Sequence, residues 1–192
     1  MKIYFVRHGE SQANLDNHQG KTYYCGQLDV DLTQTGRNSA QALESYFNTK
    51  DIQHVYVSDL KRTVQTYSCI FPYDIPTTLT PLLRERSLGV FEGKNQQELE
   101  QISEYKKYFT QSSYMNFRNS YTQRVPQGEN YQDVIDRFEA FFNHTVNSTY
   151  DTIVVVAHQI LIRCALVYLG VLKREDAKQI HIENCKPIVV EI

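Results

Sequence analysis

The chain opens with the stretch Ile3-Tyr4-Phe5-Val6-Arg7-His8-Gly9-Glu10-Ser11, in which an apolar run meets a polar turn. β-Branched and aromatic residues in so short a run predict a buried strand that ends at Arg7 and His8. In open α/β sheets, ligands bind beyond the carboxyl ends of the strands. The guanidinium of Arg7 suits phosphate oxygens, and the neutral imidazole of His8 is a nucleophile near neutral pH. The stretch therefore predicts an anion site with a nucleophile, the alternative being a histidine that only ends the strand.

A second strand, expected over Val55–Val57, leads into a helix whose first turn contains Arg62. Either Ser58 or Asp59 is expected to cap this helix through its side-chain oxygen. The free N–H groups and the dipole at a helix N-terminus attract anions, and the Arg62 guanidinium would lie beside them. This segment therefore predicts further anion-binding donors at a strand end.

A third strand end carries another histidine. Thr152–Ala157 is a continuous apolar run, as expected for a parallel strand buried on both faces, and it ends at His158. Periodicity and turn residues predict the remaining elements: a loop over 14–32, a helix from Thr33 with Ala40, Leu43, Tyr46 and Phe47 on one face, a strand at Thr77–Leu79, a long helix after 126–129, and a last strand at 187–192, at the sheet edge or antiparallel. Strands that alternate with helices predict a three-layer α/β fold with a mostly parallel central sheet flanked by helices.

The composition sets broad limits. A length of 192 residues fits a single domain over 1–192, and a net charge of −2 gives no basic face for nucleic acid or for a membrane surface. No run approaches the ~18 apolar residues that span a bilayer, and no signal peptide is evident, so we expect a cytoplasmic protein. Neither the four cysteines nor the six histidines show metal-ligand spacing, so no metal is expected.

Two motifs carry a family resemblance. Arg7-His8-Gly9-Glu10-Ser11 and the Ser-x-Leu-x-Arg-x-x-Gln-Thr run of residues 58–66 resemble the hallmarks of the histidine phosphatase (phosphoglycerate mutase-like) superfamily, and the resemblance extends over nearly the whole chain. It implies a phosphoglycerate mutase-like fold and a reaction without metal or cofactor, in which His8 becomes a phosphohistidine. It also implies the groups that bind the phosphate: Arg7, Arg62, His158, Asn14 and backbone N–H groups of Cys25 and Gly26.

The resemblance further implies a general acid. The family carries it in a Leu-x-Glu segment upstream of a Gly-x-x-Glu-Gly turn, which corresponds here to Glu85, followed by the turn at 89–93. Such a group is required because an alkoxide is a poor leaving group and the ester oxygen must be protonated. Glu92 is a second candidate, ranked below Glu85 because its position in the family is structural.

Residues 94–127 form an insertion rich in tyrosine and phenylalanine, which predicts helices and loops and no strand. The resemblance implies that this insertion is a cap over the active site that selects the substrate. Amphipathic helix faces explain the aromatic residues equally well, so the cap is predicted as a location and its ligand residues are left open.

The region of residues 124–133 and the His158-Gln159-x-x-x-Arg163 run resemble the bisphosphatase half of 6-phosphofructo-2-kinase/fructose-2,6-bisphosphatase. The counterparts of Tyr131, Gln159 and Arg163 contact the sugar phosphate in that family. In the alternative, Gln159 caps a helix and Arg163 pairs with a surface carboxylate. Gln96 stands where that family has a tyrosine, so the resemblance of the sugar site is incomplete.

We therefore predict a phosphatase of a small phosphorylated metabolite, a sugar phosphate or bisphosphate. A cofactor-dependent phosphoglycerate mutase is one alternative, although Leu88 replaces that enzyme's tyrosine and the chain has no Arg-Arg pair. A non-catalytic phospho-ligand-binding domain is the other. No nucleic-acid or membrane partner is expected, and a homodimer is left open.

Overall fold

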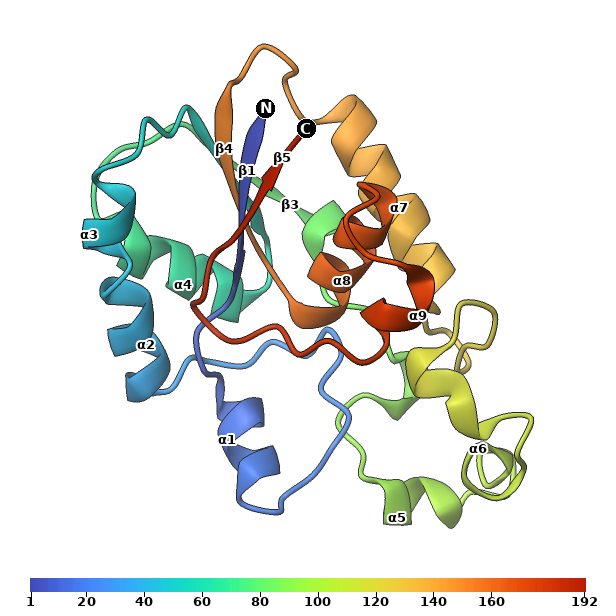
Figure 1. Ribbon diagram of the computed structural model, residues 1–192. Coiled ribbons are helices and arrows are strands. Elements are labelled where there is room, and N and C mark those ends of the chain that lie inside the picture. Colours follow the sequence, from blue (N-terminus) through green and yellow to red (C-terminus); the bar gives the residue numbers. More distant parts are fainter.

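The computed structural model describes all 192 residues, and its centre is one five-stranded sheet (Figure 1). The strands lie in the order β3-β2-β4-β1-β5, with the bounds β1 Lys2–Arg7, β2 His54–Ser58, β3 Thr77–Thr80, β4 Thr152–Ala157 and β5 Ile188–Glu191. The pairs β1–β4, β4–β2 and β2–β3 are parallel, and β5 runs antiparallel along β1 at the edge. The predicted mostly parallel sheet, including the position of its last strand, is confirmed.

Helices cover both faces of the sheet, which confirms the three-layer architecture (Figure 1). The α-helices are α1 Gln12–His18, α2 Gln34–Gln41, α3 Glu44–Phe47, α4 Lys61–Ile70, α5 Gln96–Glu100, α6 Lys107–Thr110, α7 Tyr131–His144, α8 Gln159–Tyr168 and α9 Arg174–Ala177. Short 3₁₀ turns lie at Pro81–Leu83, Gly89–Phe91 and Met115–Asn119. One face is covered by α2, α3 and α4, and the other by α7, α8 and α9.

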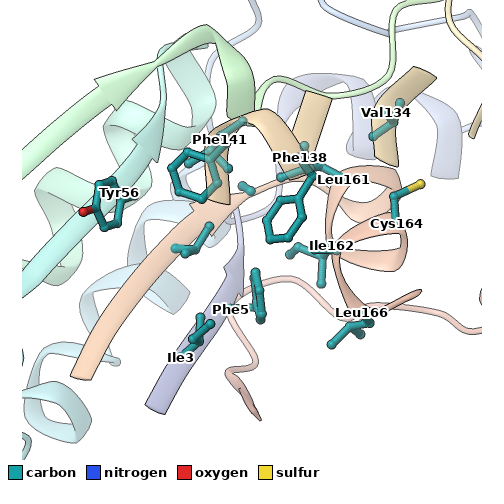
Figure 2. Packing of buried hydrophobic residues seen from close by; sticks show 14 of the residues in the cluster. Ile3, Phe5, Tyr56, Val134, Phe138, Phe141, Leu161, Ile162, Cys164 and Leu166 are labelled. Atoms are coloured by element: carbon teal, nitrogen blue, oxygen red, sulfur yellow. The ribbon is translucent and has the colours of Figure 1, made fainter. Parts of the chain in front are cut away.

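Side chains alternate across β1 and so divide the core in two. Ile3 and Phe5 pack toward α7 and α8, with Phe138 and Leu161 in the same cluster (Figure 2). Tyr4 and Val6 point to the opposite face and join a second cluster with α2, α3 and α4. Because successive residues of a strand point to opposite faces, the apolar residues of β1 contribute to the core on both sides of the sheet. The polar residues follow at the end of the strand, beyond the helices that cover the sheet.

Three local predictions are wrong. The segment 14–32 was expected to be a loop, but α1 occupies its first part because Ser11 and Asn14 form a reciprocal capping box. The expected helix from Thr33 does begin there, yet it breaks after Gln41 into α2 and α3.

The third error concerns the start of α4. Its N-cap residue is Leu60, and the N–H of Lys61 donates to the carboxylate of Asp29 at 2.7 Å. Asp59 instead accepts a bidentate ion pair from Arg84. A carboxylate of the chain itself therefore occupies the helix N-terminus that the sequence predicted as a phosphate site.

The insertion at 94–127 consists of α5, α6, a 3₁₀ turn and loops, as predicted. Its aromatic residues pack with Phe91 and Tyr24 in a third apolar cluster, separate from the two clusters on the sheet. The insertion is thus held by a small core of its own. Among the helices, none has both the length and the apolar character that crossing a bilayer requires.

Candidate active site

A cavity of about 160 Å³ lies at the carboxyl ends of β1, β2 and β4. The sheet register creates it: Arg7 pairs with Ala157 in the adjacent parallel strands, so His8 and His158 follow side by side, with their ring centroids 5.2 Å apart. The cavity is lined by Arg7, His8, Ser11, Ala13, Asn14, Asn17, Cys25, Gly26, Arg62, Glu85, Arg86, Leu88, Gln159 and Ile160.

The imidazole of His8 is fixed as one tautomer. Its Nδ1 lies 2.7 Å from the carbonyl oxygen of Gly9 and must donate to it, so Nε2 carries the lone pair and has no partner in the chain. Burial lowers the pKa of His8 well below its ordinary value, and the charges of Arg62 and Arg7 lower it further. The neutral, nucleophilic form of His8 is therefore the stable one at neutral pH.

Two buried arginines have a donor without a partner. Arg7 is 7% exposed and donates from Nη1 to the carbonyl of Ile182 and to Gln159, but its Nε bonds to nothing in the chain. Burial lowers the pKa of Arg7 to about 10, so the side chain keeps its charge at neutral pH. Arg86 is 6% exposed, and its Nε is likewise unpaired. Buried polar groups normally have partners, so two orphaned donors at one cavity indicate an anionic ligand.

Arg62 and His158 form a buried chain of hydrogen bonds with Ser58. Arg62 Nε donates to His158 Nδ1 at 3.2 Å, and His158 Nε2 therefore donates to the Ser58 hydroxyl at 2.9 Å. Arg62 also donates to the carbonyls of Leu28 and Gly26, which leaves one N–H on each terminal nitrogen for a ligand. His158 is fully buried and has both ring nitrogens occupied, so it orients Arg62 and is not among the residues that line the cavity.

The loop that faces His8 supplies further donors. The backbone N–H groups of Cys25 and Gly26 make no hydrogen bond within the chain, and both residues line the cavity. Asn14 uses its Oδ1 to cap α1, and its amide nitrogen stays free. These placements agree with the three groups expected to bind phosphate.

Glu85 lies in the cavity wall with its carboxyl oriented by backbone groups. Oε1 accepts from the N–H of Arg86 at 2.7 Å, and Oε2 accepts from the N–H of Ile160 at 3.3 Å. Glu92 does not line the cavity, because its Oε1 accepts from the backbone N–H groups of Gln27 and Leu88 and ties two loops together. The ranking of Glu85 above Glu92 agrees with this geometry.

The residues predicted to contact a sugar separate into two groups. Gln159 lines the cavity and accepts from Arg7. Tyr131 and Arg163 do not line it: the Arg163 guanidinium donates to the Tyr131 hydroxyl at 3.2 Å and to the carbonyl of Ile180 at 2.7 Å. Both side chains join α7, α8 and the segment before β5, and their direct contact with a substrate stays a prediction.

Sequence reasoning missed Arg86, which lies beside Glu85 and donates to the carbonyl of Phe117 in the insertion while its guanidinium faces the Tyr131 ring. It also assigned no role to Thr66, whose hydroxyl accepts from the N–H of Gly9 and donates to the carbonyl of Arg62. The Ser-x-Leu-x-Arg-x-x-Gln-Thr run was the available signal for Thr66. For Arg86 the only signal in the sequence was its place directly after the predicted general acid, Glu85.

Comparisons with known proteins agree with this arrangement. The profile of the "Histidine phosphatase superfamily (branch 1)" matches residues 3–192. The 6-phosphofructo-2-kinase/fructose-2,6-bisphosphatase of Gallus gallus is 30% identical over 168 residues, which is 86% of this chain. The chain spans about a third of the length of such relatives, since the match covers 32% of that protein.

Two solved structures share the fold. The alpha-ribazole phosphatase from Shigella flexneri superposes with a TM-score of 0.81 at 24% identity, over 100% of this chain and 91% of that one. The mycobacterial glucosyl-3-phosphoglycerate phosphatase superposes with a TM-score of 0.76 at 21% identity, over 98% of this chain and 88% of that one. At these identities the likeness extends to the fold alone.

Proposed function

The chain belongs to the histidine phosphatase superfamily, and from this premise we propose that it hydrolyses a small phosphorylated metabolite through a phosphohistidine on His8. Its enzyme class, a phosphatase of the histidine type, agrees with the sequence prediction. We further propose that residues 1–192 act as one domain, with 94–127 as the cap. The mechanism uses residues of this chain only.

The unpaired Nε of Arg7 carries the proposal. A charged guanidinium that is buried with an unused donor is unfavourable unless a ligand completes it. The same cavity presents the lone pair of His8 Nε2, and a phosphate group is the ligand that uses an anion site and a nucleophile at once.

In the first step His8 Nε2 attacks phosphorus, a nitrogen–phosphorus bond forms, and the bond to the ester oxygen breaks. Glu85, protonated, gives its proton to that oxygen, and the product leaves as an alcohol. The guanidinium groups of Arg7 and Arg62 and the free N–H groups of Cys25 and Gly26 hold the equatorial oxygens as charge moves onto them.

In the second step water attacks the phosphorus of the phosphohistidine while the Glu85 carboxylate takes a proton from it. The nitrogen–phosphorus bond breaks, its electron pair returns to His8 Nε2, and inorganic phosphate leaves. His158 acts in both steps as a positioning residue, because it holds Arg62 through the hydrogen bond to Nε.

The substrate class is supported by Arg86 and Gln159. Arg86 lines the cavity beside the general acid, and its positive charge suits a second phosphate or a carboxylate. Gln159 offers an amide nitrogen for a hydroxyl group. Together they support a sugar phosphate or bisphosphate as the substrate.

Phosphate release from p-nitrophenyl phosphate and from a panel of phosphorylated metabolites tests the function, with isomerisation of phosphoglycerate measured in parallel. A ³²P-labelled substrate should give an acid-labile phosphoenzyme in the parent. His8→Ala should abolish both the phosphoenzyme and turnover.

The matched control is His18→Ala, because His18 lies exposed at the end of α1 and outside the cavity. This variant should behave like the parent. Near-parental turnover in His8→Ala, or isomerisation without phosphate release in the parent, would contradict the proposal.

A further inference from the structure

A groove lies next to the catalytic cavity, and the linings of the two share Asn17. Beside the cavity is a hollow of about 330 Å³ that Asn17 also lines, with Tyr24 and Arg118 in its wall. Thr22, Tyr23 and Gln96 line this hollow and also a larger one of about 700 Å³ beyond it. In Figure 1, α1 and α5 both lie at the end of the molecule to which the carboxyl ends of the strands point.

The volumes indicate how a substrate divides between these spaces. Pockets for small molecules usually measure about 300–1,000 Å³. The catalytic cavity, at about 160 Å³, has room for the phosphate and the atoms next to it, so the remainder of a substrate must lie elsewhere. The groove is the hollow next to it, between residues 20–24 and the first helix of the cap insertion.

The lining of the groove is polar and nearly uncharged overall. Among the ten residues around the 700 Å³ hollow only one is hydrophobic, and its charged residues are one lysine, Lys21, and two carboxylates, Glu98 and Glu100. Three of its polar side chains are exposed in the lining, with their amine, hydroxyl and amide open to a ligand: Lys21, Thr22 and Gln97. Free amides and hydroxyls beside a tyrosine ring are suited to hydroxyl groups that both donate and accept hydrogen bonds.

Two parts of the groove wall are fixed by contacts within the chain: the Tyr24–Arg118 pair and the start of α5. Tyr24 is buried, and the Arg118 guanidinium lies 4.8 Å from its ring centroid while donating to its hydroxyl at 2.7 Å. Asn95 and Glu98 fix the start of α5 in a capping box, and Leu99 anchors this helix in the apolar cluster of the cap. The exposed face of α5, which carries Gln97, is therefore held in place before any ligand binds.

From this geometry we propose that the groove binds the uncharged, polyhydroxylated part of the substrate, which makes a phosphorylated disaccharide or larger glycoside the substrate class. This deepens the proposed function and rests on it. A phosphopeptide is the competing occupant; the scarcity of apolar lining disfavours it, because peptide-binding grooves depend on pockets for side chains.

Titration calorimetry on the His8→Ala protein tests the groove without turnover. The probes are trehalose 6-phosphate, glucose 6-phosphate, inorganic phosphate and a phosphoserine peptide. The disaccharide phosphate should bind at least tenfold more tightly than glucose 6-phosphate. Adding Gln97→Ala should weaken the disaccharide phosphate about fivefold, as expected for one lost hydrogen bond, and leave inorganic phosphate unchanged.

The matched control is Gln101→Ala, the same change at the exposed end of α5 and outside the groove lining. It should alter no affinity. Equal affinity for the two sugar phosphates, tighter binding of the peptide, or equal effects of Gln97→Ala and Gln101→Ala would overturn the proposal. Absence of phosphate release by the parent enzyme would instead overturn the proposed function, so the two failures are distinguishable.

Discussion

Replacing Ser58 by alanine tests the hydrogen-bond chain that we infer to orient Arg62. The Ser58 hydroxyl is fully buried and is the acceptor for His158 Nε2–H at 2.9 Å. The ring cannot switch tautomer to relieve the loss, because Arg62 Nε already donates to Nδ1. Ser58→Ala therefore leaves the buried His158 N–H without an acceptor, and it also removes the longer hydrogen bond, 3.4 Å, from the backbone N–H of Leu60.

An unsatisfied buried donor costs about 1–3 kcal/mol. In a protein of this size 1 kcal/mol shifts Tm by about 2–4 °C, so a fall in Tm of about 2–12 °C is expected. Urea unfolding gives the free energy directly. The control is Ser68→Ala, which removes an exposed hydroxyl of α4, the helix that carries Arg62. The Ser68 hydroxyl donates to the carbonyl of Val64, and its loss should change stability by less than about 0.5 kcal/mol.

A double-mutant cycle with His158→Phe assigns the loss to the pair. With the imidazole absent, Ser58→Ala should cost much less, and the coupling free energy should be about 1–2 kcal/mol. Activity on p-nitrophenyl phosphate should fall as well, because Arg62 loses its orientation. Additive effects of the two substitutions, or equal losses in Ser58→Ala and Ser68→Ala, would refute the reasoning.

Three further predictions concern the groups around the phosphate. Glu85→Gln should lower kcat/KM for an alkyl phosphate by about 10²–10⁴ and for an aryl phosphate much less, since an aryl leaving group needs little protonation; equal losses would assign Glu85 to structure. Burial holds the pKa of His8 and of His158 well below 6.5 in the folded protein. Below pH 6.5 the unfolded chain therefore binds more protons than the folded one, and the free energy of unfolding decreases as the pH is lowered. Urea unfolding should show a loss of about 1 kcal/mol per histidine between pH 6.5 and 5.5, and a loss in His8→Asn as large as in the parent would contradict this. Arg86→Met should change the free energy of unfolding by less than about 1 kcal/mol, because an orphaned buried charge is removed, yet weaken a bisphosphate substrate by about 1.5–3 kcal/mol; an equal loss for p-nitrophenyl phosphate would show that Arg86 serves the catalytic phosphate.

Strand ends explain why the centre of the site was predictable. Arg7 and His8 directly follow the last apolar residue of β1, and the parallel register of β1 with β4 brings His158 beside them. The change from apolar to polar residues at a strand end can be read in the local sequence, and a parallel sheet brings the carboxyl ends of its strands to the same edge. The positions of Arg62 and Glu85 followed from motifs that the geometry now explains.

Contacts between distant segments explain the errors. Asp29 caps α4 from 32 residues away, and no pattern near Lys61 reveals it. The resemblance assigned Tyr131 and Arg163 to the substrate; they hydrogen-bond to each other outside the cavity lining, and their contact with a substrate stays a prediction. The unpaired Nε of Arg86 could not be predicted, because the sequence shows that the residue is charged but not whether its N–H groups find hydrogen-bond partners in the fold.

The cavity and the groove depend on different parts of the fold, and this separates the chemistry from the choice of substrate. The groups that we propose to contact the phosphate are placed by the sheet register and by the hydrogen-bond chain from Ser58 to Arg62. The groove wall is placed by α5, which is anchored through Leu99 in a cluster apart from the sheet. If the groove binds the leaving group as we propose, a substitution on the exposed face of α5 should change the affinity for that group without moving His8. For such variants KM should change while kcat stays near the parental value, because the lost contacts are as strong in the ground state as in the transition state.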